Sequence, residues 1–321
     1  MFDIITIGDS TIDTFLDLEA DGHVVSVNKK KKELTLGYGA KISIDDTAQS
    51  VGGNAANVAV GLARLGHKTS IVTELGDDIN GHMIADHFKS EHVDTSLTRF
   101  VPHDTRYSVV LNVLGERTIL SGKSKRNYVL PPLKPTQAIY YTSLGHTFEK
   151  LQTQLIKYLT KHPEIFVAMN PGSYQIAHGK EEILKMIPYT DLLLLNKEEA
   201  YALSGLNNEK KAIERLCTLG TDIVVITDGD RGATAGDGQA QYHINALETN
   251  PVGKTGAGDA FSTGFLHAIL QSQDIITALQ NGILSANSVM GHLGAQIGLL
   301  TKSKLKAARK KYGSKLVVKK I

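Results

Sequence analysis

The fold is decided by one stretch, PVGKTGAGDAF, which occupies residues 251–261. Gly256, Ala257 and Gly258 carry almost no side chain, so their backbone N–H groups can approach an anion such as phosphate closely. Residues 260–270 are mainly apolar, contain no proline and are spaced like a buried helix. The small residues therefore stand at a helix N-terminus, where unpaired N–H groups and the helix dipole favour negative charge.

Asp259 falls in the first turn of this predicted helix, within reach of a group held by the N–H groups. A carboxylate beside an anion site suits proton removal from a hydroxyl that attacks a phosphoryl group, so the pattern predicts a kinase. A glycine-rich turn before a helix with an acidic first turn stays open as the alternative. The Gly-Lys-Thr at 253–255 resembles the end of a P-loop, but that motif needs glycine where Glu248 stands.

A second informative segment, VGGNAANVAVGLARLG, covers residues 51–66. Gly52 and Gly53 predict a turn that opens a helix of small and apolar residues, and Gly66 stands at its expected C-terminal end. Asn54 and Asn57 share one helical face near its start. Because amides both donate and accept hydrogen bonds, these two side chains suit the hydroxyl groups of a sugar.

Together the two segments resemble the ribokinase-like (PfkB) carbohydrate kinases. Further short motifs, in the order of that family, extend the resemblance over nearly the whole chain, at residues 7–13, 76–81, 115–118, 196–199, 227–229, 286–287 and 294–295. The resemblance implies a small sugar as acceptor, ATP as phosphoryl donor and Mg²⁺ as the ion that accompanies ATP.

The resemblance also implies roles for single residues. Asp259 becomes the catalytic base, and the N–H groups of Gly256, Ala257 and Gly258 become the anion hole. The residues implied for sugar binding are Asp13, Gly52, Gly53 and Asn57. Those implied for the nucleotide side are Asn196, Thr227, Gly229 and Asn287, and Glu199 with Asn196 is associated with Mg²⁺, acting through water.

The chain departs from the family pattern just before the anion site. Family members commonly carry Asp six residues before the catalytic Asp, where it helps to hold a monovalent cation such as K⁺, whereas this chain has Gly253 there. The missing carboxylate puts a K⁺ site in doubt. Because a lysine ammonium is itself a compact cation, we hypothesise that Lys254 replaces the ion or reaches a phosphate directly. A solvated loop lysine is the alternative.

Composition narrows the class of protein. The 321 residues can bury a large core, and 35 Lys and Arg against 33 Asp and Glu give no overall field that recruits nucleic acid or membrane. A single cysteine excludes an internal disulfide, and no stretch approaches the ~18 uninterrupted apolar residues of a membrane span. We therefore expect a soluble, cytoplasmic enzyme with neither nucleic acid nor membrane as partner.

Strand and helix patterns alternate along most of the chain. Short apolar, β-branched runs at 4–7, 138–142, 165–168, 191–195 and 223–227 are separated by helical patterns at 55–65, 79–91, 151–159, 197–203 and 210–219. Such alternation predicts an α/β fold with a mostly parallel central sheet and helices on both faces. Ligands of such folds bind beyond the carboxyl ends of the strands, where Asp13, Asn196 and Thr227 are expected.

Two regions break the alternation and predict a small β-sheet lid, residues 16–46 and 105–120, inserted in a large α/β kinase domain of residues 1–15, 47–104 and 121–321. Such a lid would cover the sugar and exclude water, which limits wasteful hydrolysis of ATP. Lids of this kind often pair between subunits, so the resemblance implies a homodimer through the lid.

The acceptor stays open among several classes. Aromatic residues that could sandwich a base, as in an adenosine-like nucleoside kinase, are Tyr38, Phe100, Tyr107 and Tyr128. The cluster of Lys123, Lys125 and Arg126 could hold the phosphate of a phosphosugar. A sugar- or nucleotide-binding regulator without catalysis is a third alternative. A nicotinamide oxidoreductase is disfavoured, because residues 8–11 after the first strand do not form the glycine-rich dinucleotide motif.

Overall fold

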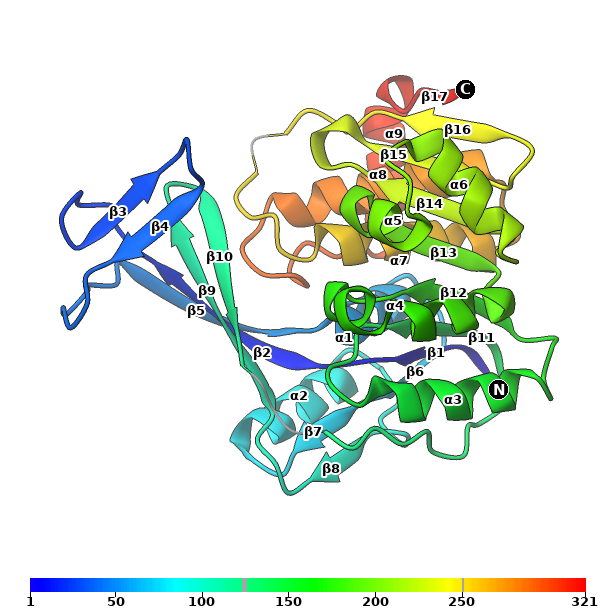
Figure 1. The fold of residues 1–321 in the computed structure, drawn as a ribbon, viewed down its shortest axis with the longest axis horizontal. Helices are drawn as coiled ribbons and strands as arrows, with labels where there is room; N and C mark the ends of the chain where they lie inside the picture. The colour runs from blue at the N-terminus through cyan, green and yellow to red at the C-terminus, as the bar shows by residue number, and fades with distance from the viewer. Residues whose placement is uncertain (123–125, 250) are drawn as a thin grey trace.

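A large sheet forms the centre of the computed structural model, which describes residues 1–122, 126–249 and 251–321 (Figure 1). In the described residues it has nine strands, in the order β17 (Val318–Lys320), β16 (Gln241–Ile244), β15 (Ala233–Gly236), β14 (Ile223–Thr227), β13 (Leu192–Asn196), β12 (Phe166–Asn170), β11 (Thr136–Thr142), β1 (Phe2–Ile7) and β6 (Thr69–Val72). Neighbouring strands in the part of this order between β6 and β14 are parallel, and those between β14 and β17 are antiparallel.

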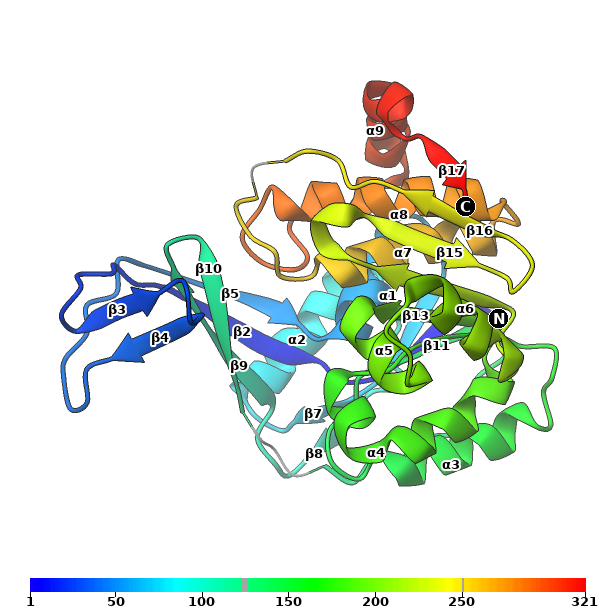
Figure 2. The same ribbon diagram turned by 45° about the horizontal axis from the view of Figure 1, so that its top comes forward.

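Helices cover both faces of this sheet (Figures 1 and 2). One face carries α1 (Asn54–Arg64), α7 (Ala257–Leu270), α8 (Ile275–Met290) and α9 (Lys302–Tyr312). The other carries α3 (Phe148–Leu159), α4 (Ser173–Met186), α5 (Lys197–Ser204) and α6 (Glu209–Thr218). Short 3-10 helices stand at Ile187–Tyr189, Gly229–Arg231 and Gly313–Lys315.

The strands are apolar on both sides because both faces are covered. Successive residues point to opposite faces, so Ile4 and Tyr140 join the core under α1 and α7, whereas Ile5 and Tyr141 join the core under α3 and α4. Beyond β6, α2 (Ile79–Ser90) packs beside the strand pair β7 (Glu74–Gly76) and β8 (Arg99–Val101). The α/β fold predicted from the alternating pattern is thus confirmed.

A smaller sheet projects from the large body (Figure 1). Its strands, in order, are β10 (Glu116–Ser121), β9 (Arg106–Val113), β2 (Thr11–Asp17) and β5 (Asp46–Gly52), and a hairpin of β3 (Val25–Asn28) and β4 (Glu33–Leu36) extends it. We call these six strands the lid. It takes in residues 11–15 and 47–52, beyond the ranges 16–46 and 105–120 predicted for it, because β2 follows almost directly on β1. The division into two units stays a prediction.

In the three described ranges, no helix combines the length and the apolar character that crossing a bilayer requires.

Candidate active site

The N-terminus of α7 lies where the large body meets the lid. Gly256 caps the helix with a positive φ of 78°, a backbone conformation that favours glycine. A Cβ on Gly256 would stand 2.5 Å from the Cβ of Ala295, so this glycine is also required by packing. A Cβ on Gly258 would meet no protein atom within 4 Å. The space beside Gly258 is therefore open to a ligand, as the predicted anion hole requires.

Asp259 follows in the first turn of α7, and its side chain is buried. It lines a cavity of about 190 Å³ together with Gly256 and Gly258. The Asn57 amide donates a 2.7 Å hydrogen bond to Oδ2 of Asp259, so the structure brings the 52–57 turn onto the acid at 259. Burial raises the pKa of Asp259 to about 6, the Asn57 hydrogen bond opposes this rise, and the charges of Asp13 and Glu199 add to it. A carboxylate with such a pKa is suited to act as a base near neutral pH.

Asp13 lies in the lid strand β2, close to the large body. Its carboxylate accepts a 3.0 Å hydrogen bond from Oγ1 of Thr11, and burial raises its pKa. Gly52 on the neighbouring strand β5 pairs with Thr11, and a Cβ on Gly52 would overlap the Asp13 carboxylate. Gly53 adopts a positive φ of 96° as the chain enters α1. Glycine is therefore required at both positions, at Gly52 because the backbone passes so close to Asp13 and at Gly53 because of its positive φ.

Asn196 and Glu199 interact at the start of α5 and line the same cavity as Asp259. The Asn196 side chain accepts a 2.8 Å hydrogen bond from the Glu199 N–H, and Oε2 of Glu199 accepts one of 3.0 Å from the Asn196 N–H. This reciprocal capping box gives the Asn-x-x-Glu pattern a structural role. Oε1 of Glu199 accepts from Ser173, and burial raises the pKa of Glu199. Among the described residues, no cluster of three or more His, Cys, Asp or Glu side chains forms a metal site.

A second cavity, of about 470 Å³, opens on the other side of the α7 N-terminus. It shares Thr227, Lys254 and Gly258 with the cavity beside Asp259, so the two cavities adjoin at these residues. The residues that line it include Gly229, Asn287 and the apolar side chains of Leu247, Phe261, Ile283, Ala286 and Met290. The buried Oδ1 of Asn287 has no hydrogen-bond partner within the described protein. A buried acceptor without a partner is suited to a ligand that donates a hydrogen bond.

The lid touches the loop that precedes α7. Arg117, at the start of β10, donates a 2.8 Å hydrogen bond from Nη1 to Oγ1 of Thr255. The Lys254 ammonium lies 3.3 Å from Oε1 of Glu116. A cleft of about 330 Å³ lies between these elements. Arg117 also lines the cavity beside Asp259, so the lid brings a cation to the site.

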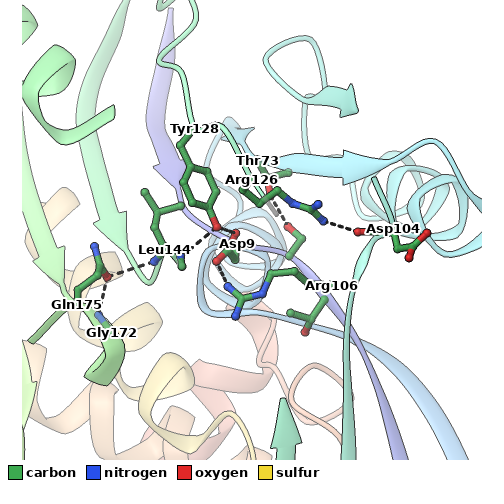
Figure 3. Close-up of polar contacts among 12 residues, drawn as sticks. Asp9, Thr73, Asp104, Arg106, Arg126, Tyr128, Leu144, Gly172 and Gln175 are labelled. Carbon is green, nitrogen blue, oxygen red and sulfur yellow. Dashed lines mark hydrogen bonds and ion pairs between the residues drawn. The ribbon is translucent and has the colours of Figure 1, made fainter. Parts of the chain in front are cut away.

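A buried polar cluster holds the base of the lid against the large body (Figure 3). The Asp9 carboxylate, just after β1, pairs with Arg106 at the start of β9 and accepts a 2.8 Å hydrogen bond from the Tyr128 hydroxyl. The Tyr128 hydroxyl in turn accepts a 3.0 Å hydrogen bond from the Gly145 N–H. Tyr128, considered above as a partner for a base, is therefore committed to this cluster. Arg126 is buried nearby and donates to the Asp104 carbonyl.

Other residues were considered above for alternative acceptors. Lys123 and Lys125 lie outside the described residues. Tyr38 is fully exposed, and Phe100 stacks on His82 with ring centroids 4.9 Å apart. In the described part of the chain, neither Tyr38, Phe100, Tyr107 nor Tyr128 lines the cavity that contains Asp259. No aromatic sandwich for a base is formed by these four.

Sequence reasoning missed several residues at the site. Asn170 lines the cavity beside Asp259 and stands at the carboxyl end of β12, so the rule that pointed to Asn196 would have found it. Ser262 lines the same cavity from α7, one turn after Asp259. Gln296 donates a 2.9 Å hydrogen bond to Oδ1 of Asn57. Nothing in the local sequence points to Gln296, because its contact depends on the tertiary fold.

Comparisons with known proteins show which family and fold the chain resembles. Residues 19–302 match the model of the pfkB family carbohydrate kinases. An ATP-dependent 6-phosphofructokinase of Thermoanaerobacterium thermosaccharolyticum is 21% identical over 299 residues, which cover 86% of this chain and 93% of the relative. A 5-dehydro-2-deoxygluconokinase of Clostridium tetani is 28% identical over 266 residues, 74% of this chain and 77% of the relative.

Among solved structures, a nucleoside kinase of Methanocaldococcus jannaschii, an archaeal member of the ribokinase family, superposes with a TM-score of 0.77 at 21% identity and covers 96% of this chain and 98% of its own. This likeness shows that the fold is ribokinase-like. Because the family model covers most of the sequence, the chain belongs to the pfkB family of carbohydrate kinases. It is a phosphotransferase whose acceptor is an alcohol group, as the sequence predicted.

Proposed function

We propose that this chain transfers the γ-phosphoryl group of ATP to a hydroxyl of a small sugar. One observation carries the proposal: the buried Asp259 carboxylate lies beside the open space at Gly258, at the junction of two cavities. A base, an anion site and room for two ligands therefore meet at one helix N-terminus. Phosphoryl transfer needs mainly positioning and electrostatic stabilisation, which these groups supply.

In the proposed reaction Asp259 accepts the proton of the acceptor hydroxyl as its oxygen attacks the γ-phosphorus. The N–H groups of Gly256, Ala257 and Gly258 stabilise the negative charge on the transferred group. Arg117 and Lys254, which both line the cavity, add positive charge to the same region. Contacts between these lid and loop residues, once the lid is closed, would exclude water from the reacting atoms.

The larger cavity fits the nucleotide. Its volume of about 470 Å³ lies within the ~300–1,000 Å³ typical of small-molecule sites, and its apolar lining suits the face of a purine. Asn287 offers the partnerless Oδ1 noted above to a donor such as an exocyclic amino group. Thr227, the last residue of β14, and Gly229 in the turn after it both line this cavity, and the resemblance implied the nucleotide side for them.

The donor set beside Asp259 also fits Mg²⁺. This ion keeps several of its waters and is commonly held by one or two carboxylates together with substrate phosphates. Glu199 offers a buried carboxylate and Asn196 an amide oxygen in the same cavity. Both are engaged in the capping box, which is consistent with contact through water. When bound, the ion would neutralise charge on the ATP phosphates.

The acceptor side contains hydrogen-bonding groups for a polyhydroxylated molecule. Asn54, at the start of α1, lines the cavity that contains Asp259, and Asp13, in the lid strand β2, lies near enough for its charge to raise the pKa of Asp259. A carbohydrate acceptor is supported by the relative named 5-dehydro-2-deoxygluconokinase, and a phosphosugar by the relative named 6-phosphofructokinase. A nucleoside acceptor is the second candidate, supported by the similarity to a nucleoside kinase structure.

We further propose a homodimer through the lid. The lid exposes large apolar side chains on strands β4 and β10, namely Leu36, Ile119 and Leu120, and the loop between β4 and β5 adds Tyr38 and Ile44. Its edge strand β10 also presents backbone groups that can pair with another chain. Sedimentation equilibrium at micromolar concentration tests this, and a monomer would contradict it. Cytoplasmic location stays a prediction, and so does the replacement of a K⁺ site by Lys254.

The decisive test of the function is release of ADP from ATP with a panel of sugars, sugar acids, phosphosugars and nucleosides. Turnover with a free sugar or sugar acid is the expected result. Turnover confined to nucleosides or to phosphosugars would replace the proposed acceptor class with that one. Tight binding of ATP and a sugar without any turnover would favour a regulator without catalysis and contradict the proposal.

A further inference from the structure

A chain of buried side-chain hydrogen bonds leads away from Asp259 toward the surface. Asn57 donates a 2.7 Å hydrogen bond from Nδ2 to Asp259, and Gln296 donates one of 2.9 Å from Nε2 to Oδ1 of Asn57. His87 on α2 lies with Nε2 2.7 Å from Oε1 of Gln296. Asn57 and Gln296 are 3% and 4% exposed, so water does not supply alternative partners for these amides.

In each of these hydrogen bonds the donor group points toward Asp259. An ionised carboxylate only accepts hydrogen bonds, so Asn57 must turn its NH₂ group to Asp259 and its oxygen away. The Asn57 oxygen needs a donor, so Gln296 must turn its NH₂ group toward Asn57. The Gln296 oxygen then points outward and needs a donor of its own. His87 supplies it with Nε2–H, in the neutral form as well as in the charged form. The orientation of each amide is therefore set by the next group outward.

The outer end of the chain is itself held in place. Arg64 on α1 donates 2.6 Å from Nη1 to the backbone carbonyl of Gln296. The same guanidinium binds the Glu91 carboxylate at the end of α2 through Nε and Nη2, at 2.9 and 2.6 Å. The loop that carries Gln296 is thus tied to both α1 and α2. Such a fixed surrounding is what keeps a functional side chain in one geometry.

We propose that Gln296 and His87 are positioning residues, which act through Asn57 to hold the Asp259 carboxylate ionised and oriented toward the acceptor hydroxyl. The inference rests on the proposed function, since it concerns the base of that reaction. If the Asn57 amide turned over, its oxygen would face the carboxylate and repel it. The outward groups prevent this, although neither touches a substrate.

The charged groups around the two ends of the chain are known. Asp13 and Glu199 face Asp259 and raise its pKa, while the Asn57 hydrogen bond lowers it. At the outer end, Glu91 lies near Arg64, His87 and His92, and its hydrogen bond from Arg64 together with their charges lowers the pKa of Glu91. Removing the outward donors weakens the one hydrogen bond that lowers the pKa of Asp259. The acid limb of the pH profile should therefore move to higher pH.

The first test replaces Gln296 with methionine, which has similar length but no hydrogen-bonding amide. The variant Gln296→Met is assayed with ATP and the acceptor that the parent phosphorylates. We expect the acid limb of the pH profile of kcat to shift by about one unit to higher pH, roughly the effect of one hydrogen bond to a carboxylate. The KM for ATP should stay within about twofold, because no contact to the nucleotide cavity is lost. Gln241→Met, at an equally buried glutamine in β16, is the matched control and should leave the limb unchanged.

A second pair of variants covers the case in which Gln296→Met does not fold. His87 is half-buried on α2, where substitutions are better tolerated than in the core. His87→Gln keeps an N–H donor for Gln296, so the acid limb of its kcat profile should lie at the same pH as in the parent. His87→Leu removes the donor and should shift the acid limb to higher pH. A purely structural role for His87 would instead lower the melting temperature in both variants and leave the limb in place.

The outcomes separate the two proposals. A parent that turns over no acceptor overturns the proposed function and this inference with it. An active parent whose Asp259→Asn variant is inactive, but whose Gln296→Met and His87→Leu variants keep the parent acid limb, overturns the inference alone. A limb that shifts in both of those variants, and returns in His87→Gln, supports it.

Discussion

The side-chain amide of Asn57 donates a 2.7 Å hydrogen bond to the carboxylate of Asp259, although the two residues are 202 positions apart in the sequence. The contact joins the N-termini of α1 and α7, so the turn predicted to bind the sugar lies against the predicted base. It is buried, and it therefore fixes the carboxylate more firmly than a contact exposed to water would. The predictions below follow from this arrangement and from the groups around it.

Replacement of the base should abolish most turnover. Asp259→Asn keeps the shape of the side chain but removes the proton acceptor, so we expect kcat to fall at least ~10²-fold. ATP affinity should change little, because the nucleotide cavity is lined mainly by other residues. Steady-state ADP release and equilibrium ATP binding measure the two effects. The exposed Asp77→Asn serves as control, and unchanged turnover in Asp259→Asn would remove Asp259 from its role.

Activity should depend on the ionisation of Asp259. Burial raises its pKa from the ordinary value of 3.8 to about 6, and only the ionised form accepts a proton. Turnover should therefore rise with pH through about 6 and level off above it. The effect on stability has the opposite sign, because the raised pKa favours the protonated folded form, and this contribution is lost as pH rises through about 6. A pH profile of kcat, with folding checked by circular dichroism, measures the limb; a flat profile from pH 5 to 8 would contradict this ~6 assignment.

Gly258 should separate stability from activity. Its missing Cβ faces open space, and alanine is favoured over glycine inside helices by up to ~1 kcal/mol, so Gly258→Ala should fold with an equal or higher melting temperature. The added methyl group would occupy the predicted anion hole and lower turnover by ~10–10²-fold. Gly313→Ala, where a Cβ also meets nothing within 4 Å, is the matched control for activity. Full turnover in Gly258→Ala would show that no anion binds there.

Lys254 should replace a monovalent cation. The parent is expected to be equally active in K⁺ and in Na⁺, and Lys254→Ala to lose up to ~10²-fold in turnover, the scale for one electrostatic donor. Lys254 also contacts Glu116 at 3.3 Å, so Glu116→Gln controls for loss of the lid contact and should retain more activity. The hypothesis fails if the parent requires K⁺ and Lys254→Ala behaves identically.

The hydroxyl of Tyr128 should stabilise the base of the lid. Tyr128→Phe leaves the Gly145 N–H and one oxygen of Asp9 without their partner, at a cost of ~1–3 kcal/mol for buried polar groups. Chemical denaturation measures the loss of unfolding free energy. Tyr38→Phe, at a fully exposed tyrosine, should have no effect. Equal stability of the two variants would show that water replaces the lost hydroxyl.

The sequence predicted the features that depend on neighbouring residues. The cap at Gly256 and the small residues before Asp259 act within one helical turn, so their spacing is visible in the chain itself. The spacing of Asn196 and Glu199 is equally local, but it was interpreted only as a pattern associated with Mg²⁺ and phosphate, and the reciprocal capping is a finding of the structure. The central strands were likewise predicted from their apolar runs, since a strand covered on both faces needs apolar residues throughout. The lid was predicted as well, but not that β2 and β5 reach to Thr11 and Gly52.

The tertiary structure alone decided which distant residues meet. Burial of Asp259, which raises its pKa, requires α1 to pack against α7, and no local pattern encodes that contact. The same holds for Gln296 and His87, and for Tyr128, whose ring looked free for a ligand but whose hydroxyl holds Asp9. Hydrogen bonds and desolvation act over a few ångströms in space, whatever the separation along the chain, so only the folded chain determines them.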